Sequence, residues 1–312
     1  MPAFCTHYIF YKEMADFLKE DADFKFNTDA AAIGTQGPDI FFFHRIIPVF
    51  MPGLPKSKVG SALHRAKPAA IFDAFRDYCK FSPNLDIAKS YIYGFILHYA
   101  LDRQCHPFVY SFQEKILQMN NHLHKSSAHN RIEMAMDTYM LNKHMNYTQP
   151  FEFDAAATIT SDISVIEEIA HLLSFVIPRV TDKQINEKDI LQAILDTKRI
   201  QKILRDRNGV LRYICRVTES IFAPIIGYYK FSAMIKPRDL EKAKKYGNIN
   251  RQTWISPYDN TIKHNESFED LFELSKSDAK KLISGFNKMC MGYSNGYEIT
   301  QNISFLTGIE VK

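Results

Sequence analysis

YIYGFILHYALDRQCHPF, which spans residues 91–108, is the stretch that decides the fold of this chain. It carries His98, Asp102 and His106 at intervals of four residues, and residues four apart lie on one face of an α-helix. The residues around this column are strongly apolar, so we expect a buried helix whose polar groups need partners. We expect it to span residues 86–105 and to end at His106, because a residue that precedes proline is biased out of the helical region.

A second column follows in HNRIEMAMD, residues 129–137, where His129 and Glu133 lie four residues apart. Imidazole nitrogens and carboxylate oxygens together suit zinc or a similar divalent ion. Five potential ligands exceed the needs of one tetrahedral site, so the two columns predict a multi-metal centre, and such centres catalyse hydrolysis, often of phosphate esters. The alternatives are a buried hydrogen-bonded network for the first column and an exposed helix-surface pair for the second.

The rest of the chain is typical of an all-α protein, because apolar residues recur at helical spacing through most of it. Extended structure is expected only at residues 298–310, and residues 254–260 are expected to form a loop. The further helices are expected at residues 6–20, 58–80, 108–120, 127–145, 160–178, 187–205, 207–226, 237–246, 266–273 and 276–292. The ligands lie within residues 1–150, and we expect residues 151–312 to pack onto this part as one domain overall.

Composition limits the classes of function. The formal net charge is +4 over 312 residues, which does not by itself argue for nucleic acid, and we predict no stable nucleic-acid partner. The five cysteines are widely spaced and form no CxxC pair, as in proteins of a reducing compartment. No basic and apolar leader opens the sequence, and no apolar run approaches the ~18 residues of a membrane span. We therefore expect a cytoplasmic location.

The acidic and imidazole residues of the first 140 positions form an ordered series. The series consists of His7, Asp39, His64, His98, Asp102, His106, His129 and Glu133. It resembles that of the zinc-dependent phospholipase C family and of the related single-strand-specific P1/S1-type nucleases, and the resemblance covers roughly the first 145 residues. It implies a multi-helical bundle that holds up to three zinc ions, or two or fewer, in a cleft and hydrolyses phosphodiesters.

The resemblance also implies a role for each ligand. The implied sets are Asp39, His64, His98 and Asp102 for one zinc, Asp102, His7 and the amine and carbonyl of the N-terminal residue for the second, and His106, His129 and Glu133 for the third. Asp102 would bridge two ions, and Asp39 would also orient or deprotonate the attacking water. Three residues separate Asp102 from His106, where the family has five. Asp137 is expected to accept a hydrogen bond from a ligating imidazole or to serve as a spare ligand.

The sequence therefore predicts a zinc-dependent phosphodiester hydrolase of phospholipase C type, with a phospholipid or another phosphodiester as substrate and transient contact with a membrane surface. One alternative is a P1-type nuclease that acts on nucleotides, and another is a non-catalytic helical protein stabilised by zinc. The aromatic run Phe41–Phe43 could line a cleft. Such a wall could hold a quaternary ammonium group by cation–π attraction or stack a nucleobase, and the sequence does not choose between the two.

Overall fold

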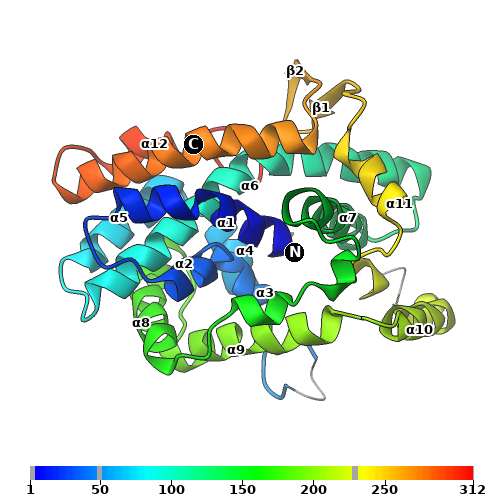
Figure 1. Ribbon diagram of the computed structural model, residues 1–312, viewed down its shortest axis with the longest axis horizontal. Helices are drawn as coiled ribbons and strands as arrows, with labels where there is room; N and C mark the ends of the chain where they lie inside the picture. Colours follow the sequence, from blue (N-terminus) through cyan, green and yellow to red (C-terminus); the bar gives the residue numbers. More distant parts are fainter. Residues whose placement is uncertain (1–3, 48–50, 227–230, 312) are drawn as a thin grey trace.

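The computed structural model describes residues 4–47, 51–226 and 231–311, and helices surround one long central helix (Figure 1). This confirms the all-α prediction. The central helix is α6 (Leu85–Met119), and the helices packed along it are α1 (Phe4–Asp21), α2 (Thr28–Gly34), α7 (Lys125–Met145) and α12 (Phe268–Cys290). The predicted ligands from the N-terminal residue lie outside the described residues.

Shorter elements complete the body. The other helices are α3 (Ile40–Phe43), α4 (Ser57–Arg65), α5 (Pro68–Cys79), α8 (Ile163–Val180), α9 (Glu187–Leu204), α10 (Val210–Ile226), α11 (Leu240–Lys244) and α13 (Gly296–Thr300). The 3-10 turns are η1 (Gly37–Asp39), η2 (Pro150–Glu152), η3 (Ala155–Thr158), η4 (Phe231–Met234) and η5 (Lys245–Gly247). Among the helices of the described ranges, none combines the length and the hydropathy needed to cross a bilayer.

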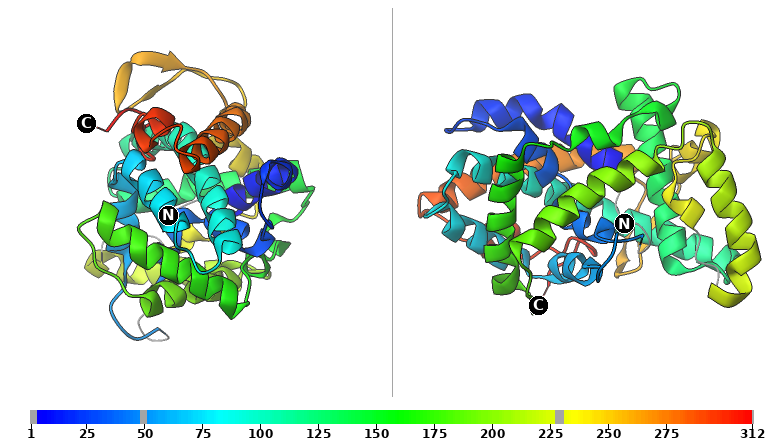
Figure 2. Two further views of the ribbon diagram at one scale, coloured as in Figure 1. Left: turned by 90° about the vertical axis from the view of Figure 1, so that its left-hand side faces the viewer. Right: turned by 90° about the horizontal axis from the view of Figure 1, so that it is seen from below.

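Two predictions about extended structure were wrong. Residues 298–310 form the end of α13 and then one isolated bridge, between Ile303 and Glu310. The predicted loop at 254–260 instead begins an antiparallel hairpin, β1 (Trp254–Ser256) and β2 (Asp259–His264), which projects from the helical body (Figure 2). Trp254 fixes the hairpin because its indole is buried and donates a hydrogen bond to the Glu266 carbonyl at 3.0 Å.

The helix boundaries near proline also differ from the prediction. The expected helix at 58–80 is two helices, because Pro68 starts α5, whereas the predicted helices at 86–105 and 108–120 are one, with Pro107 inside α6. A proline in a helix interior costs about 3 kcal/mol. Phe108, the next residue, is fully buried and meets Trp254 edge-on at 5.4 Å between ring centroids. Burying such a ring stabilises by about 1.5–3 kcal/mol, so tertiary packing offsets the proline.

Two glycines let α2 cross α6 at close range. A Cβ atom on Gly94 would lie 2.1 Å from the Ala31 carbonyl oxygen, and one on Gly34 would lie 2.2 Å from the Tyr91 carbonyl oxygen. Gly37 follows with a left-handed φ of +48°, and the ring of His98 lies against it. The close crossing therefore places η1, which carries Asp39, beside the polar column of α6.

This crossing predicts that Gly94→Ala destabilises the protein. Alanine favours a helix by about 1 kcal/mol over glycine, but the overlap with the Ala31 carbonyl forces α2 away from α6, and overpacking of this kind costs about 1–3 kcal/mol or more. We expect a lower midpoint of urea unfolding. Gly247→Ala is the control, because a Cβ there would meet nothing closer than 3.7 Å. Equal midpoints for the two variants would contradict the proposed role of the crossing.

Candidate metal centre

All eight predicted ligands lie in one buried region, although they come from five separate elements. None is more than 8% exposed. The elements and their ligands are α1 with His7, η1 with Asp39, α4 with His64, α6 with His98, Asp102 and His106, and α7 with His129 and Glu133. Because α6 continues through Pro107, His106 lies on the same helix face as His98 and Asp102. His106 therefore reaches the cluster although the helix does not end at Pro107 as expected.

Asp102 lies at the middle of the cluster. Its Oδ1 atom is 3.2 Å from His7 Nε2, and its Oδ2 atom is 3.1 Å from His98 Nε2. The same Oδ2 atom is 3.5 Å from His64 Nε2 and 3.5 Å from His106 Nδ1. One carboxylate thus contacts imidazoles from three helices, which is the position that a bridging ligand requires.

Carbonyl oxygens orient four of the imidazoles. The contacts run from His64 Nδ1 to the Gly60 carbonyl at 2.8 Å, from His98 Nδ1 to the Thr35 carbonyl at 3.1 Å, from His106 Nδ1 to the Phe305 carbonyl at 2.8 Å, and from His129 Nδ1 to the Gln113 side-chain oxygen at 3.1 Å. A carbonyl oxygen only accepts hydrogen bonds, so each Nδ1 carries the proton. The Nε2 lone pair then faces the cluster, as in imidazoles that ligate metals.

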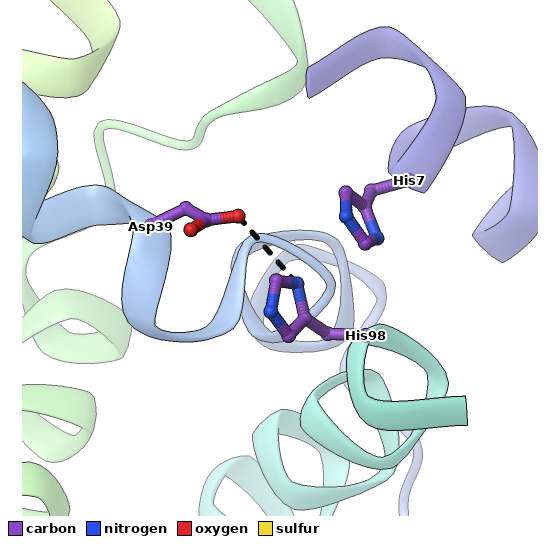
Figure 3. A group of neighbouring side chains, drawn as sticks. All are labelled: His7, Asp39 and His98. Atoms are coloured by element: carbon purple, nitrogen blue, oxygen red, sulfur yellow. Dashed lines mark ion pairs between the residues drawn. The ribbon is translucent and has the colours of Figure 1, made fainter. Parts of the chain in front are cut away.

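The ligands fall into three groups, and the potential ligand atoms of each group lie within 4.8 Å of one another. The groups are His7, Asp39 and His98, then His64, His98 and Asp102, and then His106, His129 and Glu133. The last group is the set that the resemblance implies for the third zinc. The first group differs from the implied ligand sets, because the resemblance assigns His7 and Asp39 to different zinc ions. Figure 3 shows these two side chains and His98 converging from α1, η1 and α6.

Several buried polar atoms of the cluster lack a hydrogen-bond partner among the described residues. They are His7 Nδ1, Asp39 Oδ2, His98 Nε2 and Asp102 Oδ2. The last two atoms are only 3.1 Å apart but are not aligned as donor and acceptor, as expected for two lone pairs directed at a common third atom. Unpartnered buried polar groups cost about 1–3 kcal/mol each. The donor set and its geometry therefore fit a divalent metal such as zinc.

The two carboxylates of α6 and η1 have opposite pKa shifts. Burial opposes the ionisation of Asp102, but the surrounding imidazoles, those of His106 and His98 above all, outweigh it and hold the pKa of Asp102 well below its usual range. Burial raises the pKa of Asp39, and its neighbouring imidazoles offset this only in part. Asp102 therefore ionises more readily than an ordinary aspartate, whereas Asp39 binds a proton more readily.

A cleft of about 190 Å³ opens beside the cluster. Its lining consists of Asp39, Phe42, Ser61, His64, Arg65, His106, Tyr110, His129 and Leu306. Of the predicted aromatic run, only Phe42 lines this cleft, while Phe41 and Phe43 belong to the core. The sequence reasoning missed Arg65 and Tyr110. Tyr110 follows His106 by four residues, and this spacing could have indicated it, as could the position of Arg65 directly after His64.

Asp137 has a different role from the predicted one. It accepts hydrogen bonds from the Cys5 and Thr6 amides at 3.0 and 2.8 Å and from the Thr6 hydroxyl at 2.8 Å. Among the described residues no imidazole donates a hydrogen bond to Asp137, so the expectation of an imidazole partner was wrong. The carboxylate instead holds the first turn of α1, whose free amides favour a negative charge, and it thereby positions His7.

Comparison with models of known protein families finds a match. A model of the zinc-dependent phospholipase C family matches residues 6–186, which is more than half of the chain. No curated protein and no solved structure matches. The matched range contains all eight members of the cluster, and it ends before α9.

The position of Asp102 predicts that Asp102→Asn loses more than one zinc ion per chain. An amide carries no charge and offers one oxygen, so it does not replace a carboxylate between two ions. Metal content measured by inorganic mass spectrometry tests this. Asp196→Asn, which changes another fully buried carboxylate outside the cluster, should keep the metal content of the wild type. A loss of one ion or none from Asp102→Asn would contradict the bridging role.

Proposed function

The chain belongs to the zinc-dependent phospholipase C family, and we propose that it hydrolyses phosphodiester bonds of phospholipids with a metal-activated water. The observation that carries this proposal is the convergence of eight buried imidazoles and carboxylates, four of which line a cleft. Zinc bound there would act as a Lewis acid and would lower the pKa of a water molecule towards neutrality. The rest of the proposal concerns what the side chains of this chain contribute.

Asp39 is proposed as the group that orients the attacking water and accepts its proton. It belongs to the buried cluster and also lines the cleft, and its Oδ1 atom lies 3.3 Å from His64 Nε2. A raised pKa suits a general base, because proton transfer is most efficient when the pKa of the base approaches the working pH. The lowered pKa of Asp102 suits the opposite task, that of a carboxylate which stays ionised.

Arg65 is proposed to bind the phosphate of the substrate. It lines the cleft and is exposed, and its side chain makes no hydrogen bond or ion pair with any residue of the described ranges. A guanidinium group offers paired donors that match phosphate oxygens. Tyr110 stands on the same cleft, and burial keeps its phenol neutral by raising its pKa, so it can donate a hydrogen bond to the substrate.

The C-terminal part is proposed to act with residues 1–150 as one domain. The Phe305 carbonyl accepts a hydrogen bond from His106, and Leu306 lines the cleft.

The P1-type nuclease remains a second candidate because Phe42 and Tyr110, which both line the cleft, could stack a nucleobase. The third candidate, a non-catalytic protein stabilised by zinc, differs from both in lacking hydrolysis.

Hydrolysis assays separate these candidates. We expect the zinc-loaded protein to cleave phosphatidylcholine and nitrophenyl phosphodiesters, and a chelator to abolish the activity. Asp39→Asn should lower kcat by about 100-fold or more, because general base catalysis contributes about 10²–10⁴-fold, whereas Asp196→Asn should not. Faster cleavage of single-stranded DNA than of phospholipid would favour the nuclease, and no hydrolysis by a protein with full metal content would favour the non-catalytic alternative.

The role of Arg65 predicts that Arg65→Ala lowers kcat/KM for phosphodiesters by about 10- to 100-fold, since a hydrogen bond to a charged group contributes about 1.5–3 kcal/mol. Lys67→Ala is the control, because it removes an exposed positive charge two residues away that does not line the cleft. Steady-state kinetics with zinc-loaded protein provide the measurement. The assignment is wrong if both variants lose activity equally or if neither does.

A further inference from the structure

Helix α10 turns its apolar side towards solvent. Figure 1 shows it at one end of the molecule, apart from the helices around α6. Its exposed apolar residues are Val210, Tyr213, Ile214, Val217, Ile221 and Phe222, which range from 40% to 70% exposed. Val210, Ile214, Val217 and Ile221 recur at helical spacing and therefore form one stripe. We call these four residues together with Tyr213 the α10 stripe. Amphipathic helices of globular proteins ordinarily bury such a face.

Polar contacts hold the opposite side of α10 against the body. Glu219 is buried and accepts hydrogen bonds from the Ser232 amide and hydroxyl at 2.6 and 2.7 Å. Arg212 Nη1 donates to the carbonyls of Ile235 and Lys236 at 3.0 and 2.9 Å. The helix cannot roll its stripe inwards without breaking these contacts. It contacts η4, which in turn packs on α7, the helix of His129 and Glu133.

The charges around the stripe are positive. Residues 206–222 contain three basic side chains, Arg207, Arg212 and Arg216, and two acidic ones, Asp206 and Glu219. Both carboxylates are 8% exposed, and each accepts two hydrogen bonds within the protein: Glu219 from Ser232, and Asp206 from the Leu211 and Arg212 amides. Arg207 and Arg216 are exposed. A cationic helix with an exposed apolar stripe has the physical character of helices that lie on bilayers containing anionic lipids.

We propose that the α10 stripe, with Arg207 and Arg216 beside it, docks onto an anionic phospholipid membrane surface. This rests on the proposed function, since the phospholipid substrate of the cleft is presented by a bilayer. Apolar side chains enter the interface, and the arginines contact the anionic head groups. A second copy of the chain fits the stripe less well, because a twofold contact would bring like charges together. Five apolar residues also fall short of the about 20–30 residues that each side contributes to a standard protein interface.

Co-sedimentation of the zinc-loaded full-length protein with vesicles tests the proposal. We expect binding to vesicles of phosphatidylcholine mixed with phosphatidylserine, and weaker binding to phosphatidylcholine alone. The double variant Ile214→Glu with Ile221→Glu should lower the partition coefficient about tenfold or more. The matched control is Ile163→Glu with Leu274→Glu, which changes two side chains of comparable exposure on α8 and α12 and should bind like the wild type.

Salt provides a test that needs no variant. Raising NaCl from about 0.1 M to about 1 M shortens the Debye length from about 10 Å to about 3 Å and should weaken the binding. Absence of binding to anionic vesicles, or equal loss in both double variants, would overturn the proposal. So would a dimer in light scattering that only the α10 variant dissociates, because a second copy would then cover the stripe.

The outcome is separable from that of the proposed function. Hydrolysis of a water-soluble nitrophenyl phosphodiester does not require a bilayer, so the α10 variant should retain it. If the wild type cleaves this substrate and does not bind anionic vesicles, the docking proposal alone fails. If it binds the vesicles and cleaves no phosphodiester, the proposed function fails and the docking surface stands.

Discussion

The structure depends on one buried carboxylate. Asp102 is 4% exposed and lies within 3.5 Å of imidazole nitrogens from four histidines. An isolated charge in such a place would cost several kcal/mol, so its imidazole neighbours on α1 and α4 have to meet it on α6. The crossing of α2 over α6 at Gly34 and Gly94 serves the same convergence, because it sets η1 and Asp39 beside the same column.

Backbone carbonyls decide which nitrogen of each ring is available. His64, His98 and His106 donate their Nδ1 hydrogens to carbonyls of α4, of the turn after α2, and of the C-terminal segment. This fixes the tautomer and the direction of the Nε2 lone pair. The Phe305 carbonyl is separated from His106 by 199 positions and lies outside the residues that match the family. The C-terminal part therefore shapes the site even though it supplies none of the eight predicted ligands.

The sequence predicts what depends on helical spacing and on residue type. Four-residue intervals placed His98, Asp102 and His106 on one face, and the apolar flanks indicated burial. It could not predict the continuation of α6 through Pro107, because the local bias of proline is outweighed by the burial of Phe108 against residues more than a hundred positions away. The backbone carbonyls that orient the imidazoles could not be predicted either, because every residue has a carbonyl group whatever its side chain. The hairpin at Trp254 is too short to show alternation, and its position depends on a tertiary hydrogen bond.

Two features of the molecule oppose the usual distribution of polar and apolar groups. Eight ionisable side chains are buried in one cluster, and α10 exposes an apolar stripe while it buries the charged end of Glu219. Each costs free energy in the isolated chain, the first through desolvation and the second through hydration of apolar surface. Natural sequences depart from local folding rules mainly where function requires it. Binding would recover both costs, because a metal would partner the lone pairs of the cluster and a bilayer would remove the stripe from water.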